Sequence, residues 1–272
     1  MLKWYGFDTD GNLVYTDTMV CIEVLEDGKR IPREISQGQF DEFWSDIKLW
    51  EKMRYVNNDK EQSMVHFKSE WGFEKAVFDA LIQGKFGPSW EKFIEANVQA
   101  SPIAIITARG HPIEDLKSTH KKIIYDVLTE GQREDLAYNM KEHLWTYHLF
   151  NDVAIDTYLD NNYYAPCTNE IFLKSINKDL SCSMPETKNA AFEQFTLHVK
   201  KIFESYYGAE FLVNRRIRLG FSDDANANIE WLNDFINKEY SGLMWKYPEI
   251  KFMLYNTHTP ENTIKSNYSK RK

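Results

Sequence analysis

Four short apolar runs constrain the fold of this chain more than any other feature of its sequence. The first covers residues 2–8 and ends in Asp-Thr-Asp-Gly, and the second covers residues 103–106 and is closed by Thr-Ala-Arg-Gly. The third covers residues 216–221 and runs into Ser-Asp-Asp, and the fourth covers residues 251–255. Short apolar runs of this kind that stop at polar or turn residues are typical of buried strands.

Segments with a helical period of apolar residues separate these predicted strands. They cover residues 73–83, 89–98, 112–144 (in two pieces that break near Gly131), 187–206 and 225–238. Apolar strands that alternate with helices predict βαβ units. We therefore expect an α/β fold with a three-layer, Rossmann-like parallel sheet and helices on both faces. Ligands bind such sheets at the carboxyl ends of the strands, where three of the four runs end in residues of catalytic type.

The long stretch between the first two strands is more than a simple connection needs and predicts an inserted cap. We assign residues 1–12 and 99–257 to the core, 13–98 to a largely helical cap with a small hairpin, and 258–272 to a flexible tail. The hairpin is indicated by Asp27-Gly28 between the alternating runs of residues 19–35. A helix is predicted for residues 39–54, whereas residues 145–182 fit no single pattern.

Carboxylates follow the first and third strands. Asp8 and Asp10 stand two residues apart, so that one can act as a nucleophile and the other as an acid or base. Two such charges need a cation, and oxygen ligands, including those of Asp223 and Asp224, suit Mg²⁺. A bound Mg²⁺ implies an anionic substrate, most often a phosphate. Aspartates at such positions can also be purely structural, as turn residues or helix N-caps.

Groups that suit a phosphate follow the second strand. Thr107 offers a hydroxyl beside backbone N–H groups, and Arg109 can fork onto a phosphate with two hydrogen bonds. Lys188 stands near the start of a predicted helix, from which its ammonium group can reach the same edge. His111 is a weaker candidate for a substrate contact. Four other lysines compete with Lys188 for its role: Lys174, Lys178, Lys200 and Lys201.

Composition excludes several classes of function. With 41 acidic and 33 basic residues the formal net charge is −8, so we expect no extended nucleic-acid binding, although a local site can bind a strand end. The widely spaced Cys21, Cys167 and Cys182 fit no disulfide framework and indicate a reducing compartment. No secretory signal and no apolar run of roughly 18 residues is present. We therefore expect a cytoplasmic protein without a membrane partner; its oligomeric state is not constrained.

The residues at the strand ends resemble the motifs of the haloacid dehalogenase superfamily of phosphohydrolases. Residues 7–12 match its first motif, residues 105–107 its second and residues 220–224 its acidic fourth, while Lys188 is the best candidate for the third. The Thr-Ala-Arg-Gly form, together with Ser-Asp-Asp-x-x-x-Asn, is similar to a subset found in phage and bacterial proteins and to the phosphatase half of polynucleotide kinase-phosphatases. The sequence departs from the first motif at Asn12, where Thr or Val is usual.

This resemblance implies a Mg²⁺-dependent phosphomonoester hydrolase. Asp8 would attack phosphorus and form an aspartyl-phosphate, and Asp10 would protonate the leaving oxygen and then activate water. Thr107 would hold the phosphoryl group as a catalytic and substrate-binding hydroxyl, and Arg109 would contact the substrate. That substrate would be a phosphorylated small molecule or a nucleic-acid end, such as a nucleotide or a 3′-phosphate.

The resemblance also implies the ligands of the ion. They would be the carboxylate of Asp8, the backbone carbonyl of Asp10 and the carboxylate of Asp223, with Asp224 as a further candidate. Two other hypotheses stay open from the sequence. One is a catalytically silent protein that uses the same fold for binding or structure, and the other is phosphoryl transfer to an acceptor other than water.

Overall fold

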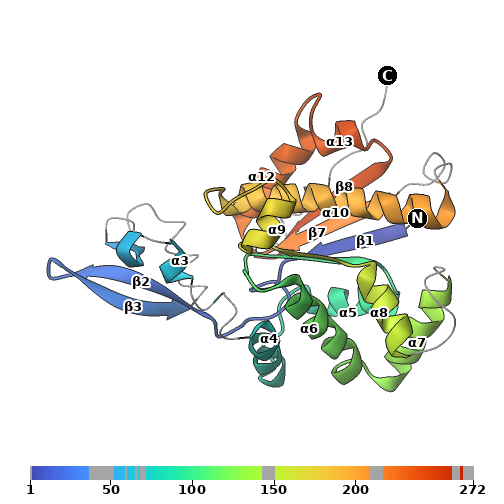
Figure 1. Cartoon of the computed structure of the whole chain (residues 1–272), viewed down its shortest axis with the longest axis horizontal. Coiled ribbons are helices and arrows are strands. Elements are labelled where there is room, and N and C mark those ends of the chain that lie inside the picture. Colours follow the sequence, from blue (N-terminus) through green and yellow to red (C-terminus); the bar gives the residue numbers. More distant parts are fainter. Residues whose placement is uncertain are drawn as a thin grey trace.

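A mixed sheet of six strands forms the centre of the described molecule (Figure 1). The computed structural model describes residues 2–36, 52–58, 60–64, 67, 72–142, 151–208, 217–258 and 264–265. The strand order is β6-β5-β1-β7-β8-β9, with β1 near the middle. The strands are β1 (Leu2–Phe7), β5 (Ile103–Thr107), β6 (Tyr163–Pro166), β7 (Ile217–Asp223), β8 (Ile250–Asn256) and β9 (Ile264–Lys265). Five strands are parallel, and the two-residue β9 pairs antiparallel with β8.

Helices lie on both sides of this sheet (Figure 1). On one side are α10 (Met184–Tyr207), α12 (Asn226–Asn237) and α13 (Leu243–Lys246). The other side carries α4 (Phe73–Ile82), α5 (Trp90–Val98), α6 (Ile113–Asp126), α7 (Glu130–Glu142) and α8 (Asp152–Asp160), and α9 (Glu170–Ser175) follows β6. Phe192 and Phe195 of α10 are fully buried, and such burial contributes roughly 1.5–3 kcal/mol for each side chain.

A second, smaller sheet projects away from the main one (Figure 1). It has the order β3-β2-β4, from β2 (Met19–Glu26), β3 (Lys29–Ser36) and β4 (Met53–Tyr55), and is followed by the short helices η1 (Val56–Asn58) and α3 (Lys60–Ser63). Asp27 and Gly28 join β2 to β3 with positive φ angles of 48° and 75°, as a type I′ hairpin turn requires. Val20, Ile22 and Phe67 form a small core of their own.

The α/β class and the parallel sheet predicted from the sequence are confirmed, and the arrangement is compatible with a Rossmann-like fold. The hairpin over residues 19–35 is also confirmed. The prediction for α10 began three residues late, because Ser183 and Glu186 form a capping box that starts the helix at Met184. Residues 145–182, which the sequence left open, contain α8, β6 and α9.

Three segments differ from expectation or fall partly outside the described residues. The helix predicted for residues 39–54 lies mostly outside them, and its described end forms strand β4 instead. Helices α4 and α5 were assigned to the cap, yet Val77 and Phe93 share a hydrophobic cluster with Phe7 of the main sheet. In the predicted flexible tail, residues 264–265 pair with β8. Helices α4 and α5 pack against the main sheet because each has an apolar face that is buried there.

Candidate active site

Three neighbouring parallel strands bring the predicted site residues to one edge of the main sheet. Strand β1 lies between β5 and β7, with Phe7 opposite Ile105 on one side and Ser222 on the other. Asp8 therefore follows β1 directly beside Asp223, the last residue of β7, and Thr107 ends β5. The backbone N–H of Asp8 donates to the Ser222 carbonyl at 3.0 Å, which fixes this register.

A buried lysine joins the two aspartates. Lys188 lies in the first turns of α10, and its Nζ is 2.6 Å from Oδ2 of Asp223 and 3.0 Å from Oδ1 of Asp8. All three side chains are almost completely buried. Two of the competing lysines are paired elsewhere: Lys174 pairs with Glu170 on the surface, and Lys200 pairs with Glu249. The structure thus places Lys188 between the two carboxylates.

The surroundings of this cluster raise the pKa values of both Asp8 and Lys188. Burial raises the pKa of Asp8 well above its usual value, and the neighbouring Asp223 and Asp224 raise it further against the opposing effect of Lys188. Burial alone would lower the pKa of Lys188, but Asp223 and Asp8 outweigh it and hold that pKa above its ordinary value. The lysine is therefore a permanent cation, whereas the carboxylates carry more negative charge than it can balance.

Local hydrogen bonds hold the fourth-motif carboxylates in place. Asn228 Nδ2 lies 3.1 Å from both carboxylate oxygens of Asp223, and the Ala225 backbone N–H donates to Oδ1 at 2.9 Å. The carboxylate of Asp224 rests against Gly11, where a Cβ atom would meet its Oδ2 at 2.2 Å. Gly11 also has a φ of 74°. A residue without a side chain is needed there both for the turn and for the approach of Asp224.

Asp8, Asp223 and Asp224 form a donor set that fits Mg²⁺. One ligand oxygen from each lies within 4.8 Å of the others. Ligand oxygens at roughly 2.1 Å from an octahedral Mg²⁺ are separated by up to about 4.2 Å, so only small side-chain shifts are needed. In addition, Asp8 Oδ1 is buried and, within the described residues, accepts no well-directed hydrogen bond, although Lys188 is close. The oxygen-only set, the excess negative charge and this atom all suit a hard cation.

A second buried ion pair lies on the other side of the same strand end. Arg109 forks onto Asp10, with Nε 2.8 Å from Oδ2 and Nη2 2.7 Å from Oδ1. Nη2 also donates to the hydroxyls of Thr16 and Thr18, and Thr16 donates to Asp10 Oδ1 at 2.6 Å. The Asp10 side chain is thus turned to Arg109 and does not belong to the carboxylate set described above. Only its backbone carbonyl remains as the metal ligand that the resemblance implies.

Arg109 determines the protonation of Asp10. Burial would raise the pKa of Asp10, but the charge of Arg109 and hydrogen bonds from Arg109 and Thr16 outweigh burial and lower it. The Arg109 guanidinium lies 5.2 Å from the centre of the Phe67 ring and 5.6 Å from that of Phe73, a favourable cation–π arrangement. The sequence predicted that Arg109 contacts substrate; in this structure its partner is Asp10.

Thr107 and His111 are also buried at this edge. Thr107 Oγ1 accepts a 3.4 Å hydrogen bond from the Arg109 backbone N–H, so its hydroxyl is placed beside the second-motif loop. Neither ring nitrogen of His111 has a hydrogen bond within the described residues. Burial and the charge of Arg109 lower the pKa of His111 to about 4, against the effect of Asp10, and the ring is therefore neutral near pH 7.

Sequence reasoning missed three supporting contributions. Asn12 Nδ2 bridges the Asp8 and Ser222 carbonyls at 3.1 and 2.9 Å and so ties β1 to β7. Its unusual identity in the first motif was the available signal. The hydroxyls of Thr16 and Thr18 hold Arg109, although no pattern marked them. Cys167 is buried near Lys188, and burial raises its thiol pKa to about 12, which keeps it uncharged.

Comparisons with protein-family models, curated proteins and solved structures gave no match. Among the described helices, none is both long enough and apolar enough to cross a bilayer.

Proposed function

We propose that the protein is a Mg²⁺-dependent phosphomonoester hydrolase with a haloacid dehalogenase-like core, and that it acts through an aspartyl-phosphate on Asp8. One observation carries this proposal: Lys188 bridges Asp8 and Asp223 at 3.0 and 2.6 Å where parallel strands end, with Asp224 beside them. Burying more carboxylates than neighbouring cations costs free energy, unless a bound ion or ligand balances the charge.

Asp8 is the nucleophile in this proposal. One of its carboxylate oxygens bonds to phosphorus while the ester P–O bond breaks in line, and the leaving oxygen takes a proton from Asp10. Water then attacks the aspartyl-phosphate and transfers a proton to Asp10. This step breaks the bond between Asp8 and phosphorus and releases inorganic phosphate. Lys188 and the Thr107 hydroxyl supply positive charge and a hydrogen bond to the transferring group.

Asp10 has to hold a proton in the first step and accept one in the second. Arg109 keeps it ionised in the present structure, which is the form needed to activate water. The negative charge of a bound phosphate offsets Arg109, and this raises the proton affinity of Asp10 for the first step. Nη1 of Arg109, which has no hydrogen bond within the described residues, is the atom left for a phosphoryl oxygen.

Asp8, Asp223, Asp224 and the backbone carbonyl of Asp10 would hold the Mg²⁺ ion. When bound, the ion neutralises charge on the phosphoryl group and helps to orient it. The three carboxylates would hold the ion in position, and Asn228 orients Asp223 through its two contacts of 3.1 Å.

The substrate class follows from this chemistry: a phosphorylated small molecule or the phosphorylated end of a nucleic acid, including a nucleotide or a 3′-phosphate. The net charge of −8 disfavours binding along a nucleic-acid backbone. Phe67, which belongs to the core of the smaller sheet, lies against Arg109, and the backbone N–H of Gly110 donates to its carbonyl at 3.1 Å. The projecting sheet is therefore in a position to influence which substrate reaches Arg109.

Phosphate release from an aryl phosphate, measured with Mg²⁺ and with a chelator, tests the proposal. We expect release that requires Mg²⁺ and falls at least about 10³-fold in Asp8→Asn, because a carboxamide cannot act as the nucleophile. Asp156→Asn removes an equal charge from a surface ion pair with Lys121 and should leave the rate unchanged. A wild type that is inactive on a broad phosphomonoester panel, or an Asp8→Asn variant as active as wild type, would refute the proposal. A stable stoichiometric assembly without turnover would favour the silent binding protein instead.

A further inference from the structure

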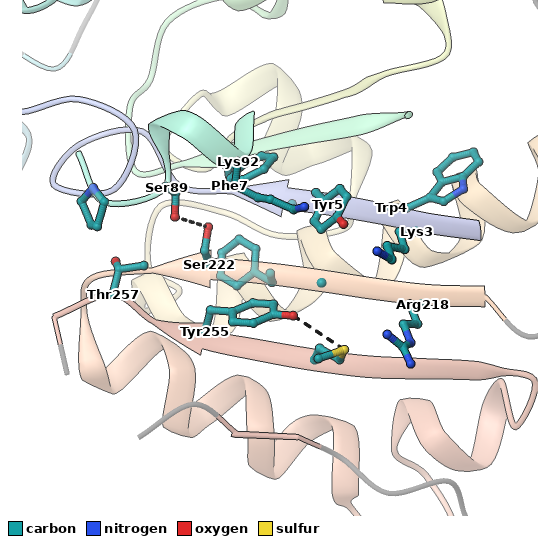
Figure 2. A pocket seen from close by; sticks show the side chains of 15 residues that line it. Lys3, Trp4, Tyr5, Phe7, Ser89, Lys92, Arg218, Ser222, Tyr255 and Thr257 are labelled. Atoms are coloured by element: carbon teal, nitrogen blue, oxygen red, sulfur yellow. Dashed lines mark hydrogen bonds between the residues drawn. The ribbon is translucent and has the colours of Figure 1, made fainter. Parts of the chain in front are cut away.

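A pocket with a volume of about 350 Å³ lies on the face of the main sheet and extends from Lys3 and Arg218 to Phe7 and Ser222, the residues directly before Asp8 and Asp223 (Figure 2). Strands β1, β7 and β8 form its floor, and α5 contributes one wall. The register places Tyr5 of β1 beside Gly220 of β7 and, two residues earlier, Lys3 beside Arg218. At about 3.3 Å per residue, Lys3 is about 16 Å along β1 from Asp8. The amino-terminal end of this pocket is thus separate from the proposed active site.

Positive charge gathers at that end. Lys3 and Arg218 are direct cross-strand neighbours. Like charges opposite one another destabilise a sheet. Lys92 of α5 also lines the pocket and pairs with Glu95 at 2.7 Å, while no acidic side chain is among the described residues that line the pocket itself. A bound anion would relieve this repulsion.

An unpartnered donor points to the same conclusion. Nε of Arg218 is buried and, within the described residues, donates no hydrogen bond. A buried donor without an acceptor destabilises the folded protein. Because Arg218 lines the pocket, an anionic group there would supply that acceptor.

The middle of the pocket suits an aromatic ring. Gly220 leaves its floor without a side chain, and a Cβ atom there would lie 3.4 Å from Tyr255 and 3.5 Å from Tyr5. The two tyrosines therefore flank the gap over Gly220 (Figure 2). Lys92 Nζ is 4.9 Å from the centre of the Tyr5 ring. A flat ring over Gly220 would contact both tyrosines at van der Waals distance.

We propose that this pocket binds a small anion that carries an aromatic ring, with the anionic group at Lys3 and Arg218 and the ring over Gly220. The volume is at the lower end of the range of small-molecule sites and fits one such molecule rather than a macromolecular segment. The proposal is independent of the phosphatase function, because none of these residues belongs to the carboxylate cluster.

Isothermal titration of the full chain in a chelator tests this site with two probes, adenosine 5′-monophosphate and naphthalene-1-sulfonate. The first represents nucleotides and the second represents other aromatic anions; the sulfonate cannot be hydrolysed as a phosphate ester. We expect at least one to bind the wild type, and adenosine or inorganic phosphate alone to bind at least tenfold more weakly, since each lacks one of the two recognised groups. The probe that binds identifies the class of ligand.

Two variants at the pocket decide the result. Lys92→Gln with Arg218→Gln should weaken binding at least tenfold, while Lys117→Gln with Lys246→Gln, the same charge change on surface ion pairs with Asp160 and Glu193, should not. Gly220→Val should also abolish binding by filling the gap, with folding checked by the melting temperature. If that variant does not fold, the charge variants decide.

Asp8→Asn separates this site from the proposed active site. Binding that is unchanged in Asp8→Asn places the probe away from Asp8. Failure of both probes to bind the wild type, equal binding by the Lys92/Arg218 variant, or loss of binding in Asp8→Asn would each overturn the proposal. None of these results depends on whether the protein hydrolyses phosphate esters.

Discussion

Two buried ion clusters flank the end of β1, and they differ in how completely they are balanced. In the first, Lys188 is the cation that Asp8 and Asp223 share, and Asp224 adds a further negative charge. In the second, Arg109 forks onto a single carboxylate, that of Asp10, and its Nη2 also donates to two threonine hydroxyls. Among the described residues, the first cluster has more carboxylates than cations, whereas the second pairs one carboxylate with one cation.

This difference separates a candidate metal site from an ion pair that is already balanced. The pKa of Asp8 is raised and that of Asp10 is lowered. Both carboxyl groups are buried, so the difference comes from their charged neighbours. A cluster with excess negative charge gains from an added cation, and a balanced one does not. We therefore expect Mg²⁺ to act on the first cluster and to leave the second unchanged.

The largest expected effect comes from removing each cation in turn. Arg109→Gln leaves Asp10 buried without its partner and should lower the free energy of unfolding by about 3–5 kcal/mol, with or without Mg²⁺. Lys188→Gln should cause a loss of similar size in a chelator, but Mg²⁺ should restore most of it, because the ion can replace the lost charge. Urea unfolding in both conditions measures the two losses. If Mg²⁺ restored the free energy of unfolding of both variants equally, the proposed difference between the two clusters would be wrong.

An intermediate effect is expected from the ion itself. Mg²⁺ at 100 times its dissociation constant should raise the free energy of unfolding of the wild type by about 2.7 kcal/mol. Asp224→Asn should weaken this stabilisation by removing one ligand, while Asp156→Asn on the surface should retain it in full. Thermal unfolding over a Mg²⁺ titration gives the shift. The same shift in Asp224→Asn as in wild type would exclude Asp224 from the ion's ligands.

The smallest effect concerns acid and the buried histidine His120. His120 is buried between Asn97 and Tyr164, and burial lowers its pKa to about 3. The unfolded chain binds this proton near pH 6.5 and the folded chain does not, so stability falls as the pH drops below about 6.5. At pH 5 the loss from this one group is about 2 kcal/mol.

His120→Gln provides the matched measurement. Its free energy of unfolding should change less between pH 7.5 and pH 5 than that of the wild type, by about that same amount. The Arg109–Asp10 pair stays charged over this range because the pKa of Asp10 is lowered. A variant with the wild-type pH dependence would show that another group causes the acid sensitivity.

The sequence predicted the elements that depend on local patterns. Apolar runs located β1, β5, β7 and β8, and Asp27-Gly28 located the hairpin because its turn needs two positive φ angles. Strand β6 was missed because Tyr-Tyr-Ala-Pro has only four residues and becomes a strand only beside β5. Tertiary pairing, not local preference, decides such a strand.

Of the candidate site, the sequence predicted the residues at the strand ends but not all of their partners. Strand ends that carry Asp8 and Asp223 meet because parallel strands share a carboxyl edge, and this rule is visible in the sequence. The pairing of Arg109 with Asp10 was not, since it depends on the return of the chain through Thr16 and Thr18. The row of cations on the sheet face also required the register of β1 against β7. Spacing along a chain does not reveal which strands become neighbours.

Chemical trapping of the covalent intermediate tests the central claim most directly. The protein is mixed with an aryl phosphate and Mg²⁺, quenched in acid and reduced with borohydride, which converts an aspartyl-phosphate to homoserine, and its peptides are then analysed by mass spectrometry. We predict homoserine at position 8, dependent on both substrate and Mg²⁺ and absent from Asp8→Asn. Phosphate release by the wild type without any modification at position 8, or with the modification at position 10, would contradict the assignment of Asp8 as nucleophile.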